Sequence, residues 1–275
     1  MDTPKNIGII GLGAMGRPMA RHLMAAGFAV AGYDPQKQAC DQAAKLGVSI
    51  KPSAAEAARA SDFVMIAVGF DSDVERVLFG TGGLMEAARA GLVIGVGSTI
   101  SPSYARELAR RTAETGIILL DMPLTRGEAA AQAGQMLVLG GGDEPTFERC
   151  RPALETFASN VFYLGAFGAG QVAKMANNMI LWACIAANDE ALRLAGSLGV
   201  NEQRLREALG QSSAQNWAMD LQVQKHPMPW AEKDMMIALG EADELRMPLP
   251  MAVHVRELIK EFKLRHDYPT PKVPK

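Results

Sequence analysis

A lysine and two asparagines at helical spacing are the residues best suited to chemistry in this chain. Lys174 is followed by Asn177 and Asn178, and on a helix the positions i, i+3 and i+4 share one face. Gly170, one turn earlier, is expected to leave open space beside them. Apolar surroundings would lower the lysine pKa, which suits an amine that shuttles a proton. The same spacing also fits a lysine that reaches solvent beside asparagines that cap backbone.

A glycine-rich segment near the N-terminus gives the second chemical signal. Its Gly-x-Gly-x-x-Gly pattern lies between a β-like run and a helical pattern, which is the context in which this motif binds a dinucleotide. The glycines permit a tight turn, close approach of backbone to a pyrophosphate and close helix–strand packing. A glycine-rich turn that binds nothing is the alternative interpretation. The predicted cofactor-binding residues of this segment are Gly11, Leu12, Gly13, Ala14, Met15 and Gly16.

Asp34 bears on which dinucleotide is bound. It follows Gly16 by eighteen residues, at the end of the second predicted strand. A carboxylate there accepts hydrogen bonds from ribose hydroxyls and repels a 2′-phosphate. Pro35 and Gln36 supply no arginine for that phosphate, and Lys37 is the only cation nearby. NAD is therefore favoured and NADP remains possible, while a simple turn carboxylate before proline is the other interpretation of Asp34.

The elements that must position these residues alternate along the first 121 residues. Short apolar runs and alanine-rich helical stretches predict βα units, so the expected fold class is α/β, with a Rossmann-type, doubly wound, mainly parallel sheet. Helices are expected at Ala14–Ala26, Gln36–Leu46, Asp73–Leu78 and Pro102–Thr115, and from Glu144. Strands are expected at Asn6–Ile10, Phe28–Tyr33, Phe63–Val68, Leu92–Val96, Ile117–Asp121, Met136–Leu139 and Val161–Leu164.

From residue 165 onward the chain has a different sequence pattern, with helical periodicity and no predicted strands. Gln171 to Ala195 contains neither proline nor glycine and is apolar on nearly every face, which predicts a long helix buried on most sides. Residues 201–265 carry helical patterns interrupted by prolines, so an all-α domain around this spine helix is expected. The predicted parts are a dinucleotide-binding Rossmann domain at 1–164, an all-α substrate and oligomerisation domain at 165–267, and a flexible tail at 268–275.

Composition narrows the class of protein. Of the 275 residues, 48% are hydrophobic and 21% charged, with a net charge of -2, which gives no electrostatic reason to expect nucleic acid or an anionic membrane. No run approaches the roughly 18 apolar residues of a membrane span. The three cysteines and four histidines show no disulfide or metal-ligand spacing, so we expect no metal and a reducing, cytoplasmic location. These residues are Cys40, Cys150, Cys184, His22, His226, His254 and His266.

Five motifs in a fixed order cover most of the sequence, and through them the chain resembles the β-hydroxyacid dehydrogenase family, which includes 3-hydroxyisobutyrate dehydrogenase and tartronate semialdehyde reductase. The family implies an oxidoreductase that uses NAD or NADP on a small β-hydroxy acid or its semialdehyde. It also implies a homodimer or homotetramer held through the helical domain. The motifs are Gly11–Met19, Gly97–Pro102, Asp121–Gly127, Gly168–Asn178 and Lys233–Met236.

The resemblance also implies roles for particular residues. Lys174 is the expected catalytic acid/base, which removes the hydroxyl proton during oxidation or protonates the carbonyl oxygen during reduction. Asn178 is expected to orient the substrate. Since the cofactor carries the electrons, the protein contributes positioning and charge control. Further expected contacts are Thr125, Arg126, Gly127 and Asn177 at the substrate, Val68 and Thr99 at the cofactor, and Lys233 at both, closing the site from the helical domain.

The sequence departs from the family at three places. Relatives commonly have Ser-Gly-Gly where this chain has Thr-Arg-Gly, and Arg126 could clamp a second anionic group. The sulfolactaldehyde reductase branch also has an arginine here, so a sulfonated or dicarboxylic aldehyde is an alternative substrate. Pairing of Arg126 with Glu128 or another acid is equally open. Residues 217–233 are shorter than in relatives, which affects Lys233, and Phe70 either packs on the nicotinamide ribose or fills core.

Other functions fit the sequence less well. A dinucleotide-binding sensor without turnover would keep the fold but would be expected to lose the lysine or the asparagine, and both are present. 6-Phosphogluconate dehydrogenase has a histidine at the position of Asn177 and a longer helical region. Imine reductases usually replace the lysine at the position of Lys174. The sensor therefore stays the alternative from a different functional class.

Overall fold

The structure of the protein is a computed structural model that describes residues 3–220 and 228–269. Within it the chain divides into two compact units, Met1–Lys174 and Met175–Lys275. Each unit is described by itself. The domain limits expected at residues 164 and 267 stay a prediction. Most of the tail predicted to be flexible, and residues 221–227 of the shortened stretch, lie outside the described residues.

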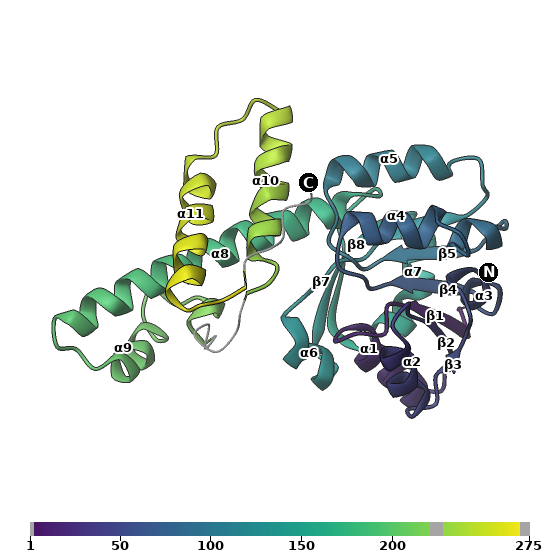
Figure 1. Ribbon diagram of the computed structural model, residues 1–275, viewed down its shortest axis with the longest axis horizontal. Helices are drawn as coiled ribbons and strands as arrows, with labels where there is room; N and C mark the ends of the chain where they lie inside the picture. Colours follow the sequence, from purple (N-terminus) through teal and green to yellow (C-terminus); the bar gives the residue numbers. More distant parts are fainter. Residues whose placement is uncertain (1–2, 221–227, 270–275) are drawn as a thin grey trace. The chain divides into compact units, whose positions relative to one another are not determined.

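The first unit is built on a sheet with the strand order of dinucleotide-binding proteins. Six parallel strands follow the order β3-β2-β1-β4-β5-β6 (Figure 1). Beyond β6, strand β8 runs antiparallel to it and pairs with β7 and β9. The predicted α/β fold is confirmed. The strands are β1 (Asn6–Ile10), β2 (Ala29–Tyr33), β3 (Ser49–Ile50), β4 (Phe63–Ile66), β5 (Val93–Val96), β6 (Ile118–Asp121), β7 (Leu124–Thr125), β8 (Met136–Gly142) and β9 (Ala158–Tyr163).

Helices cover both faces of this sheet, as its hydrophobic strands require. Met19 of α1 and Phe147 of α7 belong to the core cluster on one face, whereas Val74 of α4 and Leu108 of α5 belong to the cluster on the other. The helices are α1 (Gly16–Ala25), α2 (Lys37–Ala44), α3 (Ala54–Arg59), α4 (Asp71–Phe79), the 3₁₀ turn η1 (Leu84–Ala87), α5 (Pro102–Thr112), α6 (Gly127–Ala133) and α7 (Glu144–Leu154).

The second unit is helical throughout its described residues, as predicted. Helix α8 begins in the first unit and continues into the second, where α10 and α11 pack along each other (Figure 1). Lys263 of α11 and Glu232 of α10 form a buried ion pair at 2.9 Å, and Trp182 Nε1 of α8 donates to Asp234 Oδ2 at 3.0 Å. The elements are α8 (Ala169–Ser197), α9 (Glu202–Leu209), the 3₁₀ turn η2 (Trp217–Asp220), α10 (Ala231–Glu244) and α11 (Pro250–Arg265).

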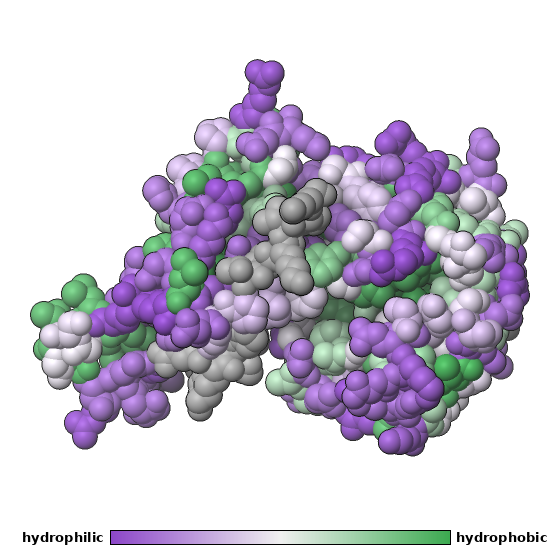
Figure 2. Space-filling view, in the orientation of Figure 1, coloured by the Kyte–Doolittle hydropathy of each residue, from purple (hydrophilic) through white to green (hydrophobic). Residues whose placement is uncertain are grey.

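Helix α8 is less buried than its sequence predicts. Its fully covered residues from Gln171 onward recur every seventh position and form one narrow stripe, whereas Ile180 and Leu194 are 66% and 64% exposed. The expectation of burial on most sides is therefore wrong for the single chain. Figure 2 shows apolar surface gathered at the end of α8 beside α9. The residues of the buried stripe are Gln171, Asn178, Ile185 and Leu192.

Candidate active site

The glycine-rich turn assigns a different task to each of its three glycines. Gly11 has φ +96°, and a Cβ there would lie 2.4 Å from the carbonyl oxygen of Ala67. A Cβ on Gly16 would lie 1.8 Å from the Gly11 carbonyl oxygen, so this glycine permits α1 to pack on the turn. No described heavy atom lies within 4 Å of the Cβ position of Gly13. The space at Gly13 therefore fits the close approach of a pyrophosphate.

The other residues of the glycine-rich turn leave its backbone accessible to a pyrophosphate. Leu12 is buried, whereas Gly13 and Ala14 are exposed, so the turn presents its main chain to solvent. Met15 is the N-cap of α1, which begins at Gly16 and not at the predicted Ala14. The first turn of α1 contains no acidic residue, so no carboxylate of the helix itself opposes an anion at its N-terminus.

Asp34 joins the ends of the first two strands. Its Oδ2 accepts from the backbone N–H of Leu12 at 2.8 Å, and its Oδ1 accepts from the N–H of Gln36 at 2.8 Å. It is thus a turn carboxylate and also a neighbour of the glycine-rich turn. Each carboxylate oxygen has a second lone pair, which leaves capacity to accept from a ribose. Lys37, the nearby cation, forms an exposed ion pair with Asp41 at 2.8 Å.

The loops after β4 and β5 are tied to each other and to α8. The backbone N–H of Val68 donates to Ser98 Oγ at 2.9 Å. The buried side chain of Gln171 bonds the two residues on either side of the half-buried Thr99. Gln171 Nε2 donates to the Ser98 carbonyl oxygen at 2.9 Å, and Gln171 Oε1 accepts from the N–H of Ile100 at 3.1 Å. Sequence reasoning gave Gln171 no role. A polar side chain at the start of an apolar helix was the available signal.

Phe70 lies in the loop between β4 and α4, two residues after Val68. Its side chain is 44% exposed, so it does not fill core, and it precedes the first residue of α4. The interpretation that Phe70 fills core is therefore wrong, and its packing on the nicotinamide ribose stays a prediction.

A buried carboxylate holds the beginning of α8. Asp121 ends β6, and its two oxygens accept from the N–H groups of Gly168 and Gln171, each at 2.9 Å. Burial raises the pKa of this carboxyl, while the backbone donors counteract that rise. A Cβ on Gly170 would lie 2.2 Å from the Leu139 carbonyl oxygen and 2.8 Å from Asp121 Oδ2. Gly170 thus serves close packing of helix on strand, and the open space expected there is absent.

Lys174 and the asparagines lie on the uninterrupted helix α8, at the spacing that the sequence predicts. Lys174 is half-buried, Asn178 is buried, and Asn177 is exposed. Asn177 Nδ2 donates to Asn178 Oδ1 at 3.0 Å, so the two amides bond each other. The chemical roles of all three stay predictions.

The segment predicted to bind the substrate carboxylate contains an unusual arginine. Thr125 is buried in β7 opposite Leu137, and Gly127, with φ +72°, is exposed at the first residue of α6. Arg126 lies between them with φ +78°, a left-handed conformation that costs a non-glycine residue roughly 1–2 kcal/mol. The relatives' glycine at this position would bear no such cost.

The Arg126 side chain binds three neutral oxygens. It donates to the carbonyl of Gln135 at 3.1 Å, Ser159 Oγ at 2.8 Å and Asn160 Oδ1 at 2.9 Å. Ser159 is the extra residue where the β8–β9 register shifts. Arg126 therefore stabilises this irregularity through neutral acceptors, and these three hydrogen bonds involve neither Glu128 nor another acid.

Lys233 is held by the second unit. It follows Glu232, which pairs with Lys263, and precedes Asp234, which accepts from Trp182. These bonds fix the first turn of α10 on both sides of the lysine. Its predicted contacts with cofactor and substrate stay a prediction.

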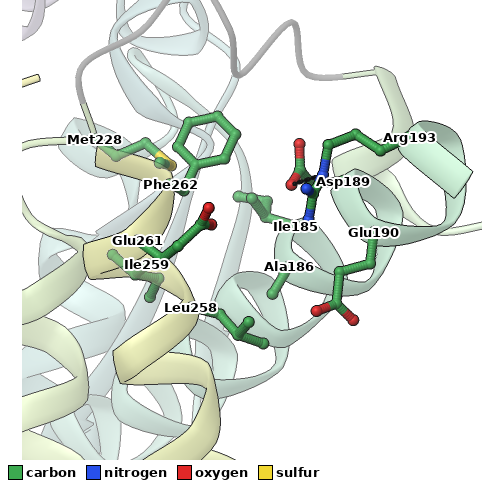
Figure 3. A pocket seen from close by; sticks show the side chains of 10 residues that line it. All are labelled: Ile185, Ala186, Asp189, Glu190, Arg193, Met228, Leu258, Ile259, Glu261 and Phe262. Carbon is green, nitrogen blue, oxygen red and sulfur yellow. Dashed lines mark hydrogen bonds and ion pairs between the residues drawn. The ribbon is translucent and has the colours of Figure 1, made fainter. Parts of the chain in front are cut away.

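The second unit also contains a pocket that includes none of the predicted site residues. Side chains of α8 and α11 face one another around it, and Arg193 forms an ion pair with Asp189 in its wall at 3.1 Å (Figure 3). Across residues 3–220 and 228–269, no group of three or more His, Cys, Asp or Glu side chains is arranged to bind a metal ion. In the same residues no helix has the length and apolarity needed to cross a membrane. The pocket is lined by Ile185, Ala186, Asp189, Glu190, Arg193, Met228, Leu258, Ile259, Glu261 and Phe262.

Comparison with known families agrees with this geometry in both halves of the chain. Residues 6–165 match the family model described as the NAD binding domain of 6-phosphogluconate dehydrogenase. Residues 168–268 match the model described as NAD-binding of NADP-dependent 3-hydroxyisobutyrate dehydrogenase. Fold, glycine turn and family models together define a dehydrogenase with a nicotinamide cofactor.

Individual relatives narrow that class. The chain is 32% identical to 2-(hydroxymethyl)glutarate dehydrogenase of Eubacterium barkeri, over 94% of this chain and 90% of the relative. It is 34% identical to 3-hydroxyisobutyrate dehydrogenase of Pseudomonas aeruginosa, over 92% and 90%. A solved structure of Mycobacterium tuberculosis 3-hydroxyisobutyrate dehydrogenase with L-serine superposes with a TM-score of 0.84 at 32% identity, covering 97% of this chain and 95% of that one. The chain belongs to the β-hydroxyacid dehydrogenase family, and it is an NAD(P)-dependent hydroxyacid dehydrogenase, as the sequence predicted.

Proposed function

We propose that this enzyme interconverts a small β-hydroxy acid and its semialdehyde with Lys174 as the general acid/base. One observation carries the assignment. Lys174 lies one helical turn beyond Gln171, whose amide bonds both neighbours of Thr99 at the carboxyl ends of the parallel strands. Ligands of open α/β sheets bind at that edge. Lys174 therefore lies on α8, whose first turn is hydrogen-bonded to the loop that contains Thr99.

Each proposed residue has a distinct task. The bound nicotinamide supplies the chemistry of accepting or giving up hydride. The Lys174 amine takes the hydroxyl proton in oxidation, or gives a proton to the carbonyl oxygen in reduction. Asn178, buried and bonded to Asn177, orients the substrate oxygen. Thr125 and Gly127 bind the substrate carboxylate, and Lys233 contacts substrate and cofactor.

The cofactor assignment is NAD, and it depends on Asp34. We expect Asp34→Ser to lower kcat/KM with NAD by about 10–100-fold, since hydrogen bonds to a charged group contribute about 1.5–3 kcal/mol. With NADP, loss of the repulsive carboxylate should leave kcat/KM unchanged or raise it. Initial rates with each cofactor give the ratio of kcat/KM with NAD to kcat/KM with NADP. Asp41→Ser, which breaks only the exposed pair with Lys37, is the matched control.

Two outcomes separate specificity from damage. An Asp34→Ser enzyme with equal losses for both cofactors would show that the carboxylate only holds the Leu12 turn. An unchanged NAD-to-NADP ratio at full activity would contradict the assignment to ribose binding.

The activities of the relatives support the proposed substrate class. These proteins act on 3-hydroxyisobutyrate and on 2-(hydroxymethyl)glutarate, and one solved relative was obtained with L-serine. Each compound is a carboxylic acid with a hydroxymethyl group, and the second is a dicarboxylate. A panel of these three compounds, a sulfonated hydroxy acid and the matching semialdehydes, followed by reduced-nicotinamide absorbance, tests the proposal. NADH binding without turnover across the panel would favour the sensor.

Arg126→Gly tests whether this residue selects the substrate. We expect the ranking of mono- and dicarboxylic substrates to stay the same, because the guanidinium is committed to Gln135, Ser159 and Asn160. Three lost hydrogen bonds of about 0.5–1.5 kcal/mol each, offset by relief of roughly 1–2 kcal/mol of backbone strain, should lower the free energy of unfolding by about 1 kcal/mol. Urea unfolding measures that change.

The opposite result has a defined meaning. If Arg126→Gly selectively abolishes turnover of the dicarboxylic or sulfonated compounds, the guanidinium gives up its bonds to Gln135, Ser159 and Asn160 and binds the second anion of the substrate. The alternative substrate class would then replace the one proposed.

We further propose a homodimer or homotetramer in a reducing cytoplasm. The exposed Ile180 and Leu194 of α8 support the oligomer, because apolar surface of this kind is typical of an interface. Cys40, Cys150 and Cys184 are free thiols, and burial raises the pKa of Cys150 to about 12, which suits a cysteine that stays reduced and inert.

A further inference from the structure

We propose that Gln171 and Asp121 are positioning residues that set the place of the Lys174 amine relative to the Thr99 loop. The inference rests on the proposed role of Lys174 as acid/base. It assigns a function to two buried polar side chains that neither touch the substrate in the proposal nor belong to the glycine-rich turn.

The side chain of Gln171 forms hydrogen bonds with the main chain just after β5, as a neighbouring strand would. Its amide donates to the carbonyl of Ser98 at 2.9 Å and accepts from the N–H of Ile100 at 3.1 Å, so both residues flanking Thr99 are bonded to one side chain. Gln171 is fully buried, and both polar atoms of its amide are satisfied. One turn of α8 separates this clamp from Lys174, so a shift of the Thr99 loop is transmitted to the amine.

Asp121 fixes the same turn of the helix from the sheet side. Its carboxylate bonds the N–H groups of Gly168 and Gln171, and a side chain at Gly170 would collide with Asp121 and with the Leu139 carbonyl. The helix start can therefore approach β6 and β8 only in this register. A negative charge at a helix N-terminus is also favoured by the helix dipole.

The bonds extend to the loop after β4. Ser98, held by Gln171 through its carbonyl, accepts from the Val68 N–H through its Oγ at 2.9 Å. One buried network thus joins the ends of β4, β5 and β6 to the start of α8. Fully satisfied buried networks are rigid, and they specify one arrangement of the groups that they join. Misplacement of a reacting group by about 1 Å can cost about 100-fold in rate.

The test is Gln171→Met, which keeps the length of the side chain and removes both hydrogen bonds. Oxidation of L-serine and 3-hydroxyisobutyrate is followed with saturating NAD, using each substrate with hydrogen and with deuterium at the carbinol carbon. We expect kcat to fall about 10–100-fold, and the deuterium isotope effect on kcat to rise because chemistry becomes rate-limiting. Merely lowered stability would not raise the isotope effect.

Arg89→Met is the matched control. Arg89 also bonds two main-chain groups, the carbonyls of Ala58 and Ser61. These residues precede β4, so they lie at the amino ends of the parallel strands, away from the Thr99 loop. We expect its kcat to stay within about twofold of wild type at a similar loss of thermal midpoint. If Gln171→Met does not fold, Gln171→Glu replaces it, because the glutamate keeps an acceptor for the Ile100 N–H and loses the donor to Ser98.

The outcomes are distinguishable from failure of the proposed function. If Lys174→Ala is inactive while the Gln171 variant retains kcat within about twofold and an unchanged isotope effect, the positioning inference is overturned. Equal losses in the Gln171 and Arg89 variants overturn it as well. If Lys174→Ala itself retains full kcat, the acid/base role fails, and the positioning inference fails with it.

Discussion

Lys174→Ala is expected to lower kcat by about 10²–10⁴-fold, the usual contribution of a positioned acid/base group. Affinity for NADH should stay within about twofold, because the pyrophosphate is assigned to the turn at Gly13 and not to α8. Steady-state rates from reduced-nicotinamide absorbance give kcat, and NADH fluorescence gives the dissociation constant. The combination of lost turnover and kept binding separates a chemical role from a structural one.

Two further variants sharpen this result. Lys174→Arg keeps the positive charge but cannot release its proton, so it should be as inactive as the alanine variant. Ethylamine added to Lys174→Ala should restore part of the rate if an amine is what is missing. Lys260→Ala, which removes an exposed lysine paired with Glu257 on α11, should behave as wild type. Wild-type turnover by Lys174→Ala would remove the central claim of the mechanism.

The regular part of the fold could be predicted from local patterns. Five of the six parallel strands follow from short apolar runs, and the long helix follows from the absence of proline and glycine after Gln171. The missed elements of the first unit are short: β3 and β7 have two residues each, the 3₁₀ turn η1 has four, α3 has six and α6 has seven. For α3 a signal was available, because Ser53 and Glu56 form the Ser-x-x-Glu pattern and Ser53 Oγ accepts from the Glu56 N–H.

The site could be predicted only where a residue acts through the main chain or through its own helix. The glycine motif follows from what glycine permits, and the Lys174–Asn178 spacing from helical geometry. Gln171 and Arg126 bond partners 73 and 34 residues away, so neither side chain's role can be deduced from its neighbours in sequence. The burial of α8 was overestimated for a related reason: periodicity shows that a face is apolar and does not show what covers it.

Gly13→Ala is expected to abolish tight cofactor binding without unfolding the protein. The added methyl meets no described atom within 4 Å, so the free energy of unfolding should stay within about 0.5 kcal/mol of wild type. The methyl occupies the place assigned to the pyrophosphate, and loss of one or two charge-assisted hydrogen bonds weakens NADH binding by at least about 10–100-fold. Urea unfolding and NADH titration of the same preparation measure both quantities.

Gly16→Ala, three residues along, should show the opposite pattern and is the matched control. Its methyl would lie 1.8 Å from the Gly11 carbonyl oxygen, so α1 must move away from the turn. Overpacking of this kind costs about 1–3 kcal/mol of stability, and any loss of NADH binding should scale with that cost. If Gly13→Ala binds NADH as wild type does, the turn holds no pyrophosphate, and the dinucleotide must be sought at another edge of the sheet. If both variants lose stability equally, the space at Gly13 is closed in solution, and the contrast between the glycines disappears.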